Sequence, residues 1–147
     1  FANQSSERNL PSEHQFYQWI WHALKNEYRR AEISLLLLDE ADARAYNRDY
    51  RQKDYATNVL SFALNEGEMM LPAQDDTLRG DLIICPQVVR REATEQGKLL
   101  AHHYAHLVLH GTLHLMGYDH INDDEAEEME ALETRLLAQL GIANPYE

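Results

Sequence analysis

The sequence predicts a single α/β domain, α+β in the broad sense, in which a small, mixed and largely parallel sheet is packed with helices. Two observations predict this class. Short apolar runs suited to strands alternate with longer segments in which apolar residues recur at helical spacing. The length of 147 residues fits one ordinary domain, and no repeat or linker divides residues 1–147. A chain of this length can bury a substantial core without disulfides or a structural metal.

The first two elements follow from a helix cap and from an apolar run. Ser12 begins a sequence of the capping-box form, and apolar residues then recur at helical spacing. A first helix should therefore run to about Arg30. The run from Ile33 to Leu38 is apolar without alternation, which is typical of a short strand covered on both faces.

A second helix is expected from about Asp39 to Arg51. Thr57 to Phe62 then suits another strand, and the stretch from Glu66 to Arg79 mixes Gly, Pro and acidic residues without periodicity, which favours a mobile surface loop. The residues that the second helix should bury are Ala43, Tyr46 and Tyr50.

The second half of the chain is expected to contain one strand and three helices. Proline suits the first turn of a helix, and glycine often ends one. The expected elements are a strand at Asp81–Cys85, a helix from Pro86 to a stop at Gly97, an apolar helix dense in histidine at Leu99–Met116 closed by Gly117, and a helix from an Asn122 or Asp123 cap to a stop at Gly141.

Charge is distributed unevenly along the chain. The net charge of -12 argues against nonspecific binding to nucleic acid, which depends on Lys and Arg. However, residues 44–53 carry four basic residues and one acidic residue, so one face could still meet an anion. The basic residues at 44–53 and an acidic cluster at 123–133 are also compatible with ordinary solvated helix faces. The acidic cluster comprises Asp123, Asp124, Glu125, Glu127, Glu128, Glu130 and Glu133.

Cysteine use and hydropathy indicate a cytoplasmic protein. Cys85 is the only cysteine, so no internal disulfide can form, and its place at the end of an apolar strand favours a core position. No apolar run approaches the roughly 20 residues that a membrane helix needs. We therefore expect no membrane partner.

The histidines at the end of the fourth expected helix predict a metal site. His110 and His114 lie four residues apart, so both imidazoles project from one helix face. Gly117 ends the helix, and the turn after it can bring His120 back over that face. Three imidazoles and an open fourth position match a catalytic zinc site, in which the pKa of bound water falls to about 7. The sequence therefore predicts one divalent metal per chain, zinc or another transition metal, used for hydrolysis.

The same helix carries further histidines that cannot all bind this ion. His102 and His106 continue the four-residue spacing, but each such step rotates the side chain by about 40 degrees, so only an adjacent pair can serve. We expect His102, His103 and His106 to be ordinary partly buried or surface side chains.

The segment HGTLHLMGYDH at residues 110–120 closely resembles the signature of the YbeY family of bacterial metal-dependent endoribonucleases. Two positions depart from the family pattern, Asn58 and Ala63, where family members often carry aspartate and proline. Neither position is a predicted metal ligand. The resemblance extends over Asn47, Tyr50, Arg51, TNVLSF at 57–62, RGDLIIC at 79–85 and DDEAEEMEALE at 123–133.

This resemblance implies a single-strand-specific endoribonuclease of the cytoplasm, with the metal bound by His110, His114 and His120. It also implies a function in ribosomal RNA processing, at the 3′ end of 16S RNA, and in ribosome quality control, with the small ribosomal subunit and its assembly factors as partners. Arg51 matches an arginine regarded as functionally important in the family. Its planar fork suits a phosphate beside a metal, although a surface salt bridge, for example with Asp54, is the alternative.

Two other functions remain open from the sequence. A zinc peptidase would also carry two histidines four residues apart on a helix, but such enzymes usually have glutamate after the first histidine, where this chain has Gly111. The second alternative is a noncatalytic ribosome-assembly factor whose metal only braces the C-terminal helices.

Overall fold

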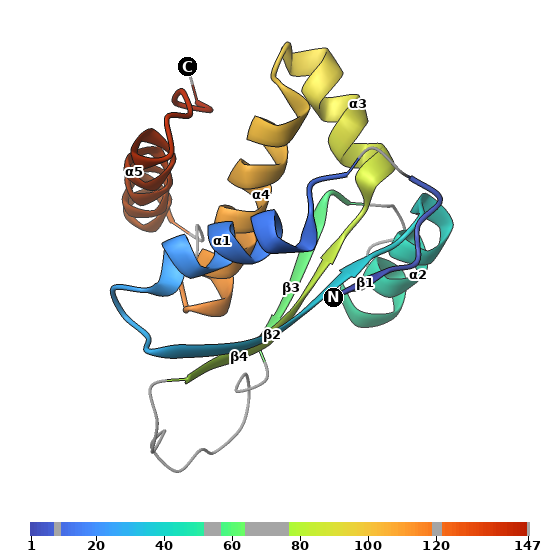
Figure 1. Cartoon of the computed structure of the whole chain (residues 1–147), viewed down its shortest axis with the longest axis horizontal. Coiled ribbons are helices and arrows are strands. Elements are labelled where there is room, and N and C mark those ends of the chain that lie inside the picture. The colour runs from blue at the N-terminus through green and yellow to red at the C-terminus, as the bar shows by residue number, and fades with distance from the viewer. Residues whose placement is uncertain (8–9, 52–56, 64–76, 119–121, 147) are drawn as a thin grey trace.

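A computed structural model describes residues 1–7, 10–51, 57–63, 77–118 and 122–146, with Arg51 described by its backbone alone (Figure 1). It has the predicted α/β class. Its elements are β1 (Ala2–Asn3), α1 (Glu13–Leu24), β2 (Arg30–Leu37), α2 (Glu40–Arg51), β3 (Val59–Ala63), β4 (Thr77–Ile84), α3 (Pro86–Gln96), α4 (Leu100–Leu115) and α5 (Asp123–Gln139).

The strands form one sheet in the order β1-β2-β4-β3. β1 pairs with β2 and β2 pairs with β4 in parallel, whereas β3 runs antiparallel to β4. Ile84 at the end of β4 lies opposite Leu37 of β2 and Val59 of β3. The prediction of a mixed, largely parallel sheet is therefore confirmed.

The two faces of the sheet bury different clusters, because successive residues of a strand point to opposite faces. Leu82 and Ile84 of β4 belong to the larger cluster, which includes residues of α1, α4 and α5. Ile83, between them, packs in a smaller cluster with Ala43 of α2. Helices α1 and α4 lie across one face of the sheet, and α2 packs against the other (Figure 1).

Helix α4 is central to the larger layer and contacts α1, α3, α5, β3 and β4. Gly111 allows its close approach to the sheet. A Cβ atom there would lie 2.9 Å from Cδ2 of Leu82 and 3.2 Å from Oγ of Ser61. The Ser61 hydroxyl also donates a hydrogen bond to the Gly111 carbonyl at 3.0 Å. The sheet therefore fixes the segment of α4 that carries the predicted metal ligands.

The predicted helix caps are confirmed at the starts of α1 and α5. The Ser12 side chain accepts a hydrogen bond from the Gln15 amide, and the Asn122 side chain accepts one from the Glu125 amide. Gly97 follows α3 with φ of 64°, in the left-handed region where glycine is favoured. Local sequence therefore determines these helix ends.

Three predicted boundaries are wrong, because strand pairing extends further than local periodicity suggests. Strand β2 begins at Arg30 rather than at Ile33. The first helix ends at Leu24 rather than about Arg30, because Arg30 already pairs with Thr77 in the sheet. Strand β4 correspondingly begins at Thr77, not at Asp81. The last residues of the expected loop are thus strand, and residues 66–76 of it lie outside the described part of the chain.

Burial in α2 also differs from the prediction. Ala43 is buried as expected, but Tyr50 is 65% exposed and Asn47 is buried instead. The helix turns its polar Asn47 inward and leaves the Tyr50 ring at the edge of the sheet, against Phe62. Cys85 is buried, as expected for a core position.

Candidate metal centre

Helix α4 brings the two predicted ligands His110 and His114 together. Their side chains project from successive turns, and their Nε2 atoms lie 3.0 Å apart. Their ring planes are nearly perpendicular, at 85°. Two nitrogens bound to one tetrahedral zinc, each at about 2.0–2.1 Å, would lie roughly 3.3 Å apart. The spacing of the two Nε2 atoms therefore fits two ligands of one ion.

The other ring nitrogen of each histidine has a partner that can only accept a hydrogen bond. Nδ1 of His110 contacts a carboxylate oxygen of Glu133, and Nδ1 of His114 lies 3.0 Å from the backbone oxygen of Tyr118. Each Nδ1 therefore carries the proton, and in the neutral ring Nε2 keeps its lone pair. Two lone pairs facing each other at 3.0 Å require a cation between them, either a proton or a metal ion. The donor set thus fits a divalent metal.

Glu133 is a charged residue in the protein core. Its side chain is fully buried on α5, and its carboxylate contacts Nδ1 of His110, Nε2 of His106 at 3.1 Å and the Tyr146 hydroxyl. Burial raises the pKa of this carboxyl, but hydrogen bonds from His106, His110 and Tyr146 outweigh it and hold the pKa at about 2. Glu133 is therefore ionised at neutral pH and accepts from all three groups.

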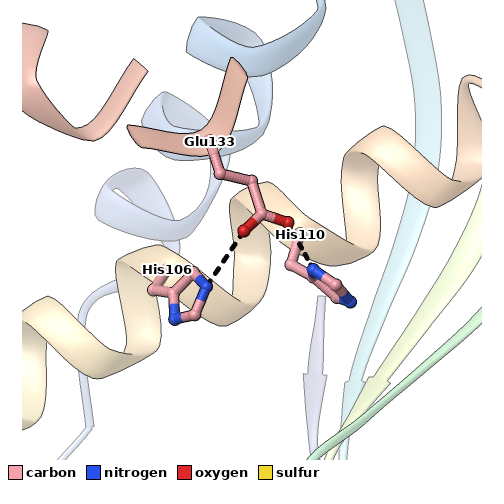
Figure 2. Close-up of side chains that lie close together, drawn as sticks. All are labelled: His106, His110 and Glu133. Carbon is pink, nitrogen blue, oxygen red and sulfur yellow. Dashed lines mark hydrogen bonds and ion pairs between the residues drawn. The ribbon is translucent and has the colours of Figure 1, made fainter. Parts of the chain in front are cut away.

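His106, His110 and Glu133 also form a second candidate metal group (Figure 2). One possible ligand atom from each residue lies within 4.8 Å of the others. Figure 2 shows both imidazoles facing the carboxylate, while the second nitrogen of His110 points away from it. A metal in this group would replace the protons that the two rings donate to Glu133. A metal bound by the Nε2 atoms of His110 and His114 would leave the protons donated to Glu133 in place. We therefore favour this pair as the metal site.

A cleft of about 900 Å³ lies beside these histidines. Strand β3 and the two residues before it form one wall, and α4 with the turn after it forms the other. Because Ser61 and the histidines face the same cleft, a molecule bound there would lie against the candidate ligands. The lining side chains include His106, His110 and His114 and three tyrosines, Tyr28, Tyr118 and Tyr146.

The structure addresses some of the predicted site residues. His110 and His114 lie together as predicted, whereas His120 and the Arg51 side chain lie outside the described residues. His103 is buried against Glu92, with 3.0 Å between Nε2 and the carboxylate.

The sequence interpretation missed three residues of the site: His106, Glu133 and Tyr146. His106 was expected to be an ordinary side chain, and Glu133 was counted with the solvated acids. A pattern that could have identified Glu133 is its place among apolar residues of α5, four after Met129 and four before Leu137, both buried.

Fold and site together define a small α/β protein with a candidate metal centre on its central helix, beside a cleft. No helix in the described ranges is both long and apolar enough to cross a membrane.

Comparisons with known proteins agree with this class. The family model for endoribonuclease YbeY matches residues 1–141. A protein of Neisseria meningitidis serogroup B named endoribonuclease YbeY is 67% identical over 147 residues, covering 100% of this chain and 87% of the relative. A protein of the same name from Pseudomonas fluorescens is 54% identical over 143 residues, covering 97% and 92%. A solution structure from Thermotoga maritima has a TM-score of 0.61 at 25% identity, covering 86% and 79% of the two chains.

The chain therefore belongs to the endoribonuclease YbeY family. The match covers nearly the whole chain and includes every residue that lines the cleft except Tyr146. The resemblance seen in the histidine segment is thus confirmed as family membership.

Proposed function

We propose that this chain is a metal-dependent endoribonuclease that cleaves single-stranded RNA. The observation that carries the proposal is the pair of Nε2 atoms 3.0 Å apart, with acceptors on both Nδ1 atoms, at the wall of the cleft. Membership of an endoribonuclease family gives the reaction class. Hydrolysis at this centre is the function that the geometry supports best.

The cleft has features that suit unpaired RNA. Tyr28, Tyr118 and Tyr146 contribute aromatic rings to its lining, and Thr57 and Asn58 contribute hydrogen-bonding groups. Unpaired bases can stack on aromatic rings and bond through their exposed edges, which paired bases cannot do. These side chains support the proposed preference for single strands.

The proposed metal is one Zn²⁺ per chain, held by His110, His114 and His120. The ion, when bound, supplies positive charge that activates the attacking oxygen and stabilises charge on phosphorus. Nitrogen ligands suit zinc among the common divalent metals, and other transition metals accept the same set. The protein contributes the ring orientation, because Glu133 and the Tyr118 carbonyl hold the two Nδ1 protons.

Arg51 is the proposed phosphate ligand. It ends α2, shortly before Thr57, which lines the cleft. A guanidinium in contact with the scissile phosphate would bind two oxygens and stabilise the charge that develops there. The match of Arg51 to the family arginine supports this function.

The proposed biological substrate is ribosomal RNA, at the 3′ end of the 16S molecule. We also propose a function in ribosome quality control in the cytoplasm. The proposed partners are the small ribosomal subunit and its assembly factors. The support for these finer statements is the resemblance in residues 110–120 and the other matched segments.

The alternative of a zinc peptidase is not favoured, because the glutamate that usually carries the proton in such enzymes is missing. The residue after the first ligand histidine is Gly111, and this position packs against Leu82 and Ser61 of the sheet. A glutamate at position 111 would meet the sheet, not the substrate. The other alternative, a metal that only braces the fold, requires a direct test.

Removing the metal should separate catalysis from bracing. We expect chelation to abolish cleavage of an unstructured RNA while the helical circular dichroism signal stays nearly unchanged, because the main core is apolar and the ligands His110 and His114 are only partly buried beside it. Zinc added back should restore cleavage. If the chelated protein unfolds, the metal is a brace; if it still cleaves RNA at the original rate, the reaction does not need the metal.

A further inference from the structure

We propose that Glu133 is a positioning residue for the metal ligand His110, and that His106 and Tyr146 hold the Glu133 carboxylate in place. The inference rests on the proposed metal site and adds a function for three residues behind it. Glu133 does not face the cleft, so it acts through His110 rather than on RNA.

The two oxygens of Glu133 have different partners. Oε1 accepts from Nδ1 of His110, whereas Oε2 accepts from Nε2 of His106 and from the Tyr146 hydroxyl. The carboxylate is therefore held by two donors, His106 and Tyr146, in addition to the proposed metal ligand His110. One oxygen is anchored, and the other is aimed at His110.

This arrangement determines which nitrogen of His110 can bind a metal. A carboxylate at Nδ1 retains the proton there, orients the ring and makes Nε2 a better electron donor. Nε2 then faces Nε2 of His114. Because the Glu133 side chain is 0% exposed, water cannot replace it as the acceptor.

The anchoring donors come from separate parts of the chain. His106 lies on α4, one turn before His110, whereas Tyr146 lies beyond α5 near the C-terminal end of the described residues. The Tyr146 segment is also attached to the connection between α3 and α4, because Nζ of Lys98 donates to the Pro145 carbonyl at 3.2 Å. The segment after α5 thus contributes to the candidate metal centre through the Glu133 carboxylate.

The chain contains a matched control for Glu133. Glu92 of α3 accepts a hydrogen bond at 3.0 Å from Nε2 of His103, which lies on α4 two turns before His110. This pair also joins a histidine of α4 to a carboxylate, and Glu92 accepts a second hydrogen bond, from Nδ2 of Asn58 at 3.0 Å. For Tyr146 the control is Tyr17, whose hydroxyl donates to the Ile33 carbonyl at 3.1 Å.

The experiment measures zinc affinity, by titrating each apoprotein with zinc in competition with a chromophoric chelator. Glu133→Gln should bind zinc roughly 10- to 100-fold more weakly than the wild type, as expected when an outer-shell partner is lost. Tyr146→Phe should weaken binding by a smaller factor, because His106 still anchors Oε2. Glu92→Gln and Tyr17→Phe should bind zinc as the wild type does.

Thermal melts of the apoproteins separate positioning from a purely structural function. Wild-type zinc affinity in folded Glu133→Gln and Tyr146→Phe would overturn the proposal, as would an equal loss in Glu92→Gln. If Glu133→Gln does not fold, the zinc affinity of Tyr146→Phe alone tests the proposal. This variant keeps the aromatic ring and is therefore expected to fold. Failure of the proposed function looks different: the wild type would bind zinc through this network and would not cleave RNA.

Discussion

Replacing His114 with alanine is expected to remove most of the bound metal, whereas replacing His102 is expected to leave the metal content unchanged. His114 supplies one of the two Nε2 atoms that lie 3.0 Å apart. Without it, at most two of the three proposed protein ligands remain, too few for a stable zinc site. His102 lies on the same helix and belongs to no candidate metal group among the described residues.

Native mass spectrometry of the two variants and the wild type measures this difference. It also distinguishes the two candidate metal groups. The group of His106, His110 and Glu133 does not include His114. Full metal content in His114→Ala would therefore contradict the Nε2 assignment and favour that group.

Replacing Arg51 with alanine should lower RNA cleavage by roughly a hundredfold or more, the loss seen when one preorganised donor to a developing charge is removed. Metal content and the free energy of unfolding should stay nearly unchanged. Arg51→Lys should restore only part of the rate, because an ammonium keeps the charge without the two-pronged contact. Single-turnover cleavage of an unstructured RNA measures these rates, beside thermal melts and metal analysis.

The matched control for Arg51 is Arg48→Ala. Arg48 lies on the same helix, is exposed and pairs with Asp49 at 3.1 Å, so its loss should change neither cleavage nor metal content. If Arg51 is only a surface salt-bridge partner, its substitution should cost about 1 kcal/mol of unfolding free energy or less and leave cleavage unchanged. Wild-type rates in folded, metal-loaded Arg51→Ala would end the phosphate-binding proposal.

Features that depend on neighbouring residues were predictable from the sequence. The Ser12 cap, the Gly97 stop and the His110–His114 pair all follow from helix geometry over three or four residues, and the structure has each of them. Apolar runs were sufficient to predict the α/β class, because a sheet buried on both faces requires them.

Features that depend on pairing between distant elements were not predictable in this way. The end of α1 was placed too late, because β2 begins at Arg30 through its pairing with β4. From the sequence, Glu133 appeared to be one acid of a solvated cluster. Its contacts with His106 and His110 arise from the packing of α5 on α4, which the local sequence does not show. Tyr146 lies outside any helix or strand, so no periodic pattern points to it. Its place in the site depends on the path of the chain after α5.

The most direct test of metal-dependent RNA cleavage is to titrate the apoprotein with zinc and measure cleavage of one RNA in single-stranded and in duplex form. The proposed function predicts that single-strand cleavage rises with added zinc and stops rising at one ion per chain, while the duplex stays intact. Cleavage that is independent of zinc, or an absence of cleavage in fully loaded protein, would contradict it.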